Sequence, residues 1–264
     1  MIELHDHPMS PCAQKVRLVL AEKALDYEAH FVDLAAKANL RPEYLALNPK
    51  GLVPTLVYDG QPIIESTVIA EFLEERHPQP RLTPDDPLSR ARMRVWTKHV
   101  DEVIHPAAGA LQWPMLMLPV LGQLPQEQAE ALLAQVPDPV RRDRQQQLYR
   151  NGLAAPVAAA GIRAFDKTLG DMESVLADRP YLLGDTFSLA DIGLMPYFQT
   201  IRNFAWEALY EPHRPAVGDW CRRCFERPSY AAAIERAIPA EQLDKMRAAG
   251  EQAWPELAAH LKAA

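Results

Sequence analysis

A proline-rich segment divides the chain into two parts with different hydrophobic patterns. His77–Pro87 holds four prolines in eleven residues, a density that interrupts regular secondary structure and is typical of a linker. Before it, short apolar runs alternate with helical periodicity and predict the order β-α-β-α-β-β-α. The first two strands are joined by a crossover helix and are therefore parallel, which implies a mixed sheet. After it, the periodicity is helical throughout. The sequence thus predicts an α/β domain followed by an all-helical one.

These patterns define the expected elements and boundaries. The first part is expected to contain strands at 1–5, 27–32, 55–58 and 62–64 and helices at 15–23, 42–47 and 67–76. An Asp-Gly pair at 59–60 between two apolar runs predicts a hairpin. Later helices are expected at 88–105, 140–178, 188–204, 215–226 and 229–237. We predict an α/β domain over 1–80, a linker over 81–88, a helical domain over 89–240 and a helical tail over 241–264.

Charge and glycine usage exclude several classes of function. The 264 residues include 28 Lys and Arg against 35 Asp and Glu, a net charge of −7, whereas nucleic-acid binding needs clustered basic side chains. The 11 glycines form neither G-x-G nor Gly-Lys, so the dinucleotide fingerprint and the P-loop are both missing. Three cysteines fit a reducing compartment. Because the N-terminus lacks the features of a signal peptide, we expect a cytoplasmic protein without a nucleic-acid partner.

One uncharged stretch is long enough to cross a membrane. Residues 103–126 contain no Asp, Glu, Lys or Arg over 24 positions, a length that could span a bilayer. Prolines at 106, 114, 119 and 125 argue against a membrane helix. We expect no membrane partner and interpret the stretch as buried or pocket-lining chain with broken helices.

Ser10 and Pro11 mark the start of the first helix. Serine is a preferred N-cap, and proline is favoured at the first helical position. Ser10 can therefore be a structural cap. It can also be functional, because helix N–H groups and the positive end of the helix dipole favour a thiolate. A hydroxyl there can donate a hydrogen bond to a bound thiolate and lower its pKa.

Four motifs, in this order, resemble the glutathione transferase superfamily. They are the segment Ser10–Leu18 (SPCAQKVRL), the segment Asn48–Leu56, the segment Glu65–Glu74 and the segment Phe187–Ile192. They are similar to the active-site turn of serine-type classes, the loop before the third strand, the glutathione-binding turn with the third helix, and a capping box. The resemblance covers nearly the whole chain. It implies a thioredoxin-like N-terminal domain with a mixed four-stranded sheet, an all-α C-terminal domain, glutathione as cosubstrate, a homodimer and a role such as detoxification.

The resemblance assigns the central part of the glutathione site. Ser10 would stabilise the glutathione thiolate. The Val53–Pro54 bond would be cis, so that the Val53 N–H and C=O pair with the cysteinyl backbone of glutathione; an ordinary trans proline at a strand edge is the alternative.

Two further pairs are candidates for the carboxylates of glutathione. Glu65 and Ser66 lie at a predicted helix start, where a hydroxyl and exposed N–H groups suit the γ-glutamyl carboxylate; Ser66 is also interpreted as the N-cap. Lys37 and Lys50 are candidates for the glycine carboxylate, or are solvated lysines.

Cysteine offers a competing chemistry. Cys12 lies on the first turn of the same helix, where the pKa of a thiol can fall, and a catalytic Cys12 would imply a glutathione-dependent reductase or isomerase. Cys221 and Cys224 form a C-x-x-C inside a predicted helix, without a preceding strand, and are interpreted as helix-interior residues.

Two other patterns are interpreted as structural. Ser188-x-x-Asp191 has the spacing of a capping box, so Asp191 is excluded from the site. His5 and His7 would share one face of a strand, but without further ligands we expect no metal.

The acceptor is expected to be a hydrophobic, aromatic electrophile. Met93–Glu102, Glu65–Ile69 and the long tail are similar to bacterial transferases that cleave β-aryl ethers with glutathione. In those enzymes the thiolate attacks the carbon that bears the aryloxy group and expels a phenolate. The expected pocket residues, or alternatively core and dimer-interface residues, are Trp113, Met115, Met117, Phe204 and Trp206. A non-catalytic binding or regulatory protein of the same fold is the alternative to an enzyme.

Overall fold

The computed structural model describes residues 1–235 and 238–262. The chain divides into two compact units, each built from three separate segments. Unit 1 comprises Met1–Lys98, Asp178–Pro196 and Asp219–Pro239, and unit 2 comprises His99–Ala177, Tyr197–Gly218 and Ala240–Ala264. Residues 89–98, 178–196 and 219–239, which we expected in the helical domain, therefore belong to the same unit as the sheet.

Unit 1 contains a four-stranded mixed sheet. Its strands are β1 (Ile2–Asp6), β2 (Glu28–Phe31), β3 (Thr55–Tyr58) and β4 (Gln61–Ile64), in the spatial order β2-β1-β3-β4. β1 and β2 are parallel, and the other two pairs are antiparallel. The expected mixed sheet is confirmed, including the parallel pair joined by a helix.

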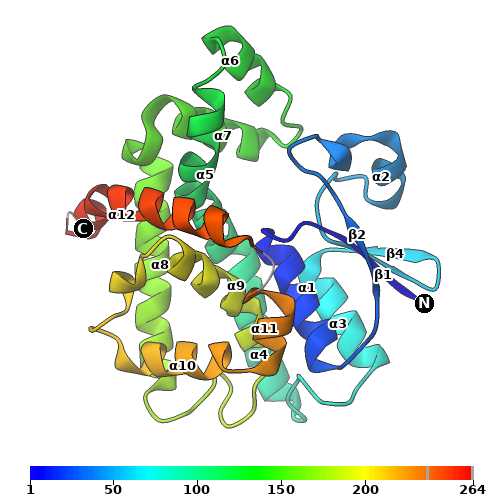
Figure 1. The fold of residues 1–264 in the computed structure, drawn as a ribbon. Helices are drawn as coiled ribbons and strands as arrows, with labels where there is room; N and C mark the ends of the chain where they lie inside the picture. Colours follow the sequence, from blue (N-terminus) through cyan, green and yellow to red (C-terminus); the bar gives the residue numbers. More distant parts are fainter. Residues whose placement is uncertain (236–237, 263–264) are drawn as a thin grey trace. The chain divides into compact units, whose positions relative to one another are not determined.

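Three helices belong to this sheet. They are α1 (Pro11–Glu22), α2 (Pro42–Leu47) and α3 (Ser66–Arg76), with a short 3-10 turn at Ala38–Leu40 before α2. α1 and α3 lie side by side next to the sheet (Figure 1). Fully buried leucine and isoleucine side chains from strands and helices form the core here, among them Leu4, Leu18, Leu56, Ile69 and Leu73. α1 begins four residues earlier than the periodicity predicts, because its first turn is defined by capping rather than by apolar side chains.

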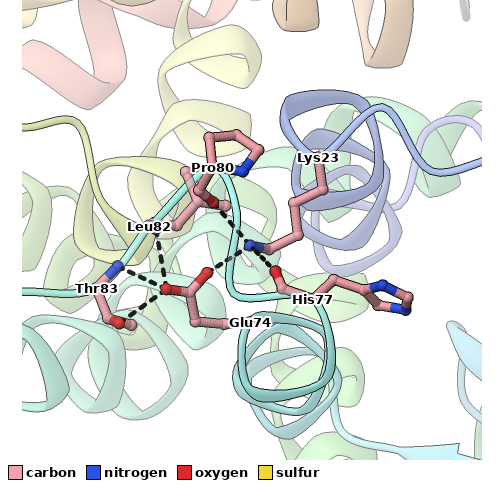
Figure 2. Close-up of polar contacts among 6 residues, drawn as sticks. All are labelled: Lys23, Glu74, His77, Pro80, Leu82 and Thr83. Atoms are coloured by element: carbon pink, nitrogen blue, oxygen red, sulfur yellow. Dashed lines mark hydrogen bonds and ion pairs between the residues drawn. The ribbon is translucent and has the colours of Figure 1, made fainter.

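The proline-rich segment is held by a buried ion pair. The Lys23 ammonium group lies 2.5 Å from Glu74 Oε2, and the lysine side chain is fully buried. Because an unpaired buried charge is costly, both charged groups need several hydrogen bonds. These bonds go to backbone and hydroxyl groups of the segment (Figure 2), namely His77 O, Pro80 O, Leu82 N, Thr83 N and Thr83 Oγ1. The first half of the proline-rich segment, residues 77–83, is therefore held in place by hydrogen bonds.

A buried carboxylate, Asp191, connects two of the later segments of unit 1. α4 (Pro87–His99) follows the linker, and α9 (Leu189–Asn203), α10 (Pro215–Phe225) and α11 (Pro228–Ala233) come later in the chain. Asp191 accepts hydrogen bonds from Ser188 N and Oγ, both 2.9 Å long, and from Trp220 Nε1 at 2.9 Å. The predicted capping box is confirmed. Burial raises the pKa of Asp191, against the effect of these hydrogen bonds.

Unit 2 is helical. A π-helical turn (Val100–Ile104) leads into α5 (His105–Leu121), followed by α6 (Gln126–Ala134), α7 (Pro139–Asn151), a 3-10 turn (Gly152–Ala154), α8 (Pro156–Leu176), a 3-10 turn (Glu207–Leu209) and α12 (Ala240–Lys262). α5 packs along α8, where Gly161 approaches the backbone of Ala107 so closely that a Cβ would lie 3.2 Å from its carbonyl oxygen. Small residues therefore set the distance between these helices.

Two expectations for this unit are wrong. Most of the uncharged stretch, residues 105–121, lies in one continuous helix, α5, with Pro114 and Pro119 inside it. An interior proline costs about 3 kcal/mol, but the buried apolar face of α5 offsets that cost through packing. Conversely, the helix expected over 140–178 is interrupted, because Gly152 at φ +56° ends α7 and Pro156 begins α8. Part of the helix expected at 229–237 lies outside the described residues.

No helix among the described residues has the length and apolar character needed to cross a membrane.

Candidate active site

The register of the sheet brings three predicted segments to the same end. His5 on β1 pairs with Thr55 on β3, and Thr55 pairs with Ile64 on β4. Because β3 is antiparallel to both neighbours, its first residue lies beside the last residues of β1 and β4. The loop that leads from β1 to Ser10, the Val53–Pro54 bond and the turn at Glu65 therefore all leave the sheet at this end.

Ser10 occupies the predicted cap of α1. Its backbone is extended, at φ −77° and ψ 116°, and its Oγ accepts a hydrogen bond from Ala13 N at 3.3 Å. Pro11 is the first helical residue, as predicted. The residue as a whole is half-buried and lies at the positive end of the helix dipole.

Two polar side chains of α1 hold the loop before Ser10. The Pro8 carbonyl oxygen accepts hydrogen bonds from Gln14 Nε2 at 2.9 Å and from Arg17 Nη2 at 2.7 Å. Arg17 Nε also lies 3.2 Å from Asp6 Oδ2, the last residue of β1. Burial raises the pKa of Asp6, and Arg17 partly opposes that effect. Our sequence reasoning missed Gln14 and Arg17, although a polar residue one turn after a helix cap was a usable signal.

The Val53–Pro54 peptide bond is cis, as the resemblance implies. The loop before it is fixed by Tyr44 and Asn48: the Leu52 carbonyl oxygen accepts from the Tyr44 hydroxyl at 2.6 Å and from Asn48 Nδ2 at 2.7 Å. Among the hydrogen bonds of the described chain, none uses the backbone N–H or C=O of Val53. Both groups are therefore available to a peptide ligand.

The turn from β4 into α3 differs from the expectation in one respect. Glu65, not Ser66, is the N-cap, and it has a positive φ of +70°. Such a conformation costs a residue with a Cβ on the order of 1–3 kcal/mol and is concentrated at functional sites. Ser66 is the first helical residue and is buried. Because Ile69 N is the first amide to bond back, to Glu65 O, the amides of the first turn point outward as anion donors.

The two predicted lysines differ in their surroundings. Lys50 Nζ lies 2.7 Å from Glu65 Oε1 on the exposed surface, so the structure brings these two predicted residues together. Lys37 is exposed and precedes the 3-10 turn with φ +53°.

The cysteines separate into two environments. Cys12 is partly exposed on the first turn of α1, two residues after Ser10. Cys221 and Cys224 are buried inside α10, and burial raises the pKa of Cys224 well above its usual range. A protonated, buried thiol is a poor nucleophile.

The expected acceptor residues fall into two groups within unit 2. Met115 is half-buried on α5. Trp113 and Met117 are partly buried and pack against a small cluster of Leu121, Ala129 and Leu133.

Phe204 and Trp206 are fully buried, and their rings stack with centroids 4.8 Å apart. The Trp206 indole N–H donates to Gly250 O at 3.0 Å. We therefore revise the assignment of these two rings from an acceptor pocket to the core, the alternative noted above.

Comparisons with known proteins give the family. The model of the glutathione S-transferase N-terminal domain matches residues 9–76, and that of the C-terminal domain matches residues 140–223. Protein LigF of Sphingobium is 30% identical over 83% of this chain and 87% of its own length. The chain belongs to the glutathione S-transferase family.

Solved structures agree with this result. The crystal structure of the β-etherase LigF matches with a TM-score of 0.78 and 28% identity, over 92% of this chain and 99% of LigF. A glutathione transferase of Burkholderia graminis, crystallised with two glutathione molecules per subunit, matches with a TM-score of 0.65 and 25% identity, over 92% and 87% of the chains. Among sequence relatives, maleylacetoacetate isomerase of Pseudomonas aeruginosa is 31% identical over 92% of this chain and 98% of its own length.

Proposed function

We propose that this protein is a glutathione transferase that transfers the glutathione sulfur to a hydrophobic aromatic electrophile, with β-aryl ethers as the acceptor class. The observation that supports it best is the convergence of Ser10, Val53–Pro54 and Ser66 at one end of the sheet. The similarity to the β-etherase LigF supports the acceptor class.

In the proposed reaction, Ser10 Oγ–H donates a hydrogen bond to the thiolate sulfur of glutathione. The Val53 backbone pairs with the cysteinyl part, and Ser66 with the first amides of α3 binds the γ-glutamyl carboxylate. Lys50 and Lys37 are proposed for the glycine carboxylate. The thiolate attacks the carbon bearing the aryloxy group, a C–S bond forms, the C–O bond breaks, and the electron pair leaves on the phenolate. Trp113, Met115 and Met117 are proposed for the acceptor pocket.

Ser10→Ala tests the role of the hydroxyl. We expect the pKa of the bound glutathione thiol to rise by about two units, equivalent to about 2.7 kcal/mol of lost thiolate stabilisation. The measurement is a pH titration of thiolate absorbance in the complex. Cys12→Ala is the matched control and should leave the titration unchanged. Loss of activity in Cys12→Ala with activity retained in Ser10→Ala would instead assign a cysteine mechanism.

Ser66→Ala tests the binding of the γ-glutamyl carboxylate. Loss of a hydrogen bond to a charged group should weaken glutathione binding by about 1.5–3 kcal/mol, measured by isothermal titration calorimetry. Ser89→Ala, on α4, is the control and should bind glutathione normally. If the unmodified protein shows no binding of glutathione, the transferase proposal fails and a non-catalytic role replaces it.

A substrate panel tests the acceptor class. Turnover of a β-aryl ether with glutathione, above that of an aryl halide and a mixed disulfide, is the expected result. Isomerisation is the second candidate, favoured by the similarity to maleylacetoacetate isomerase, and a cis unsaturated diacid in the same panel distinguishes it. We further propose that the protein is a cytoplasmic homodimer. Light scattering of the purified protein tests the dimer.

A further inference from the structure

Four ionisable side chains gather on one face of the β1–β2 pair. Glu3 and His5 are two residues apart on β1, so their side chains point to the same face. In the parallel register Glu3 lies opposite Glu28, and His5 lies opposite His30. The sheet therefore places two imidazoles and two carboxylates next to one another. None of these four residues is among those proposed to bind glutathione.

The polar atoms of this cluster are already close. His30 Nε2 lies 3.2 Å from Glu3 Oε2 and 3.4 Å from Glu28 Oε1. The rings of His5 and His30 stack with centroids 4.4 Å apart. One ligand atom from each of Glu3, His5 and His30 lies within 4.8 Å of the other two.

His30 Nε2 is buried and makes no hydrogen bond within the described chain. Its polar neighbours are the two carboxylates of Glu3 and Glu28. The His30 side chain as a whole is 32% exposed and that of Glu3 is 26% exposed. The cluster is therefore partly open to solvent, so an ion could enter it and still be bound by protein side chains on its other sides.

The chemistry of the donor set selects a class of ion. Two imidazoles with carboxylates suit Zn²⁺ and its divalent neighbours Co²⁺, Ni²⁺ and Cu²⁺, whereas Mg²⁺ and Ca²⁺ prefer oxygen ligands. In a tetrahedral zinc site with bonds of about 2.0–2.1 Å, ligand atoms lie about 3.3 Å apart. The 3.2 Å between Glu3 Oε2 and His30 Nε2 is close to that value.

We propose that Glu3, His5 and His30, with Glu28 as a fourth ligand, bind one divalent transition-metal ion, and that Zn²⁺ occupies the site. The bound ion would link the edge strand β2 to β1 and stabilise unit 1. From the sequence we expected no metal, because no further ligands could be assigned beside His5 and His7. The register supplies these from β2 instead, while the His7 ring lies 5.5 Å from that of Phe31.

Calorimetry on the tag-free protein, in the absence of glutathione, tests the proposal. We expect one equivalent of Zn²⁺ to bind and to raise the melting temperature, with no such effect of Mg²⁺. His30→Gln should weaken Zn²⁺ binding roughly 100-fold or more, beyond the 10–100-fold typical of outer-shell changes. His213→Gln, at an exposed histidine of unit 2, is the matched control and should bind as the unmodified protein does.

X-ray absorption of the one-equivalent zinc adduct of the unmodified chain gives a result that does not depend on any variant folding. Two imidazole ligands with oxygen ligands support the site. Sulfur ligation, a single imidazole, or no saturable binding would overturn it, as would His30→Gln and Glu3→Gln variants that bind zinc normally. Glutathione binding is measured separately, so failure of the metal site leaves the transferase proposal intact.

Discussion

At the scale of single residues, Gly51 and Gly60 share a left-handed backbone but differ in what surrounds them. Gly51 has φ +59°, and a Cβ there would lie 2.8 Å from Leu40 Cδ2 and 3.0 Å from Asn39 O. Gly60, in the β3–β4 turn, has φ +80°, and a Cβ would meet nothing within 4 Å. Comparing the two positions therefore separates the cost of backbone strain, which both share, from the cost of packing, which only Gly51 in the loop before Pro54 carries.

Gly51→Ala should cost more stability than Gly60→Ala. Both changes incur about 1–2 kcal/mol for a Cβ in the left-handed region, and Gly51→Ala adds about 1–3 kcal/mol of overpacking. Because Gly51 lies in the loop before Val53, its substitution should also weaken glutathione binding. Urea unfolding and calorimetry measure the two effects. Equal losses of stability in the two variants would contradict the prediction.

At the scale of elements, Gly250 lets α12 pack against the end of α9. A Cβ on Gly250 would overlap the Phe204 carbonyl oxygen and lie 2.6 Å from its carbonyl carbon. The carbonyl oxygen of Gly250 in turn accepts the Trp206 indole N–H at 3.0 Å. Gly170, on α8, has no atom within 4 Å of an added Cβ. Helix propensity alone therefore predicts the opposite of what packing predicts at Gly250.

Gly170→Ala should stabilise the protein by about 0.5–1 kcal/mol, because alanine is the better helix former. Gly250→Ala should destabilise it by about 2 kcal/mol or more, because backbone atoms must move. Thermal unfolding of the two variants gives the sign directly. A stabilising Gly250→Ala would show that α12 does not contact the Phe204 backbone.

At the scale of the whole molecule, unit 1 is assembled from segments far apart in the sequence. The Glu22 carboxylate at the end of α1 pairs with Arg227 through two contacts of 2.7 Å and accepts a 2.5 Å hydrogen bond from Ser229 Oγ. The Arg227 guanidinium also lies 3.8 Å from the centre of the Phe187 ring. Burial opposes the ionisation of Glu22, but the hydrogen bonds from Arg227 and Ser229 outweigh it and lower its pKa.

This lowered pKa predicts a pH-dependent stability. The contribution of ionised Glu22 is fully present above its unfolded pKa of about 4.3 and is lost as the pH falls through the lower folded value. Glu22→Gln should therefore destabilise the protein by about 2 kcal/mol at neutral pH, and the difference from the unmodified protein should shrink toward pH 3. Urea titrations across this range measure it. Glu226→Gln, at an exposed neighbour of Arg227, is the control and should show no such trend.

The sequence by itself determined the features that depend on neighbours along the chain. The fold class, the order of the first seven elements, the Ser10 cap and the capping box at Asp191 follow from periodicity and cap chemistry, which act within one helical turn or strand. Motif resemblance added the cis Val53–Pro54 bond and the glutathione transferase family. For the same reason, the three segments proposed to bind glutathione could be found without coordinates.

Only the tertiary structure decided features that depend on partners remote in sequence. Packing kept α5 continuous despite its prolines and buried Phe204 and Trp206 in the core. Strand register brought His30 beside His5, and folding brought Arg227 to Glu22. Gln14 and Arg17 find their hydrogen-bond acceptor, the Pro8 carbonyl oxygen, only once the loop before α1 is folded. Burial and pairing between distant segments carry no local signal, because their free energy arises only once both partners are in place.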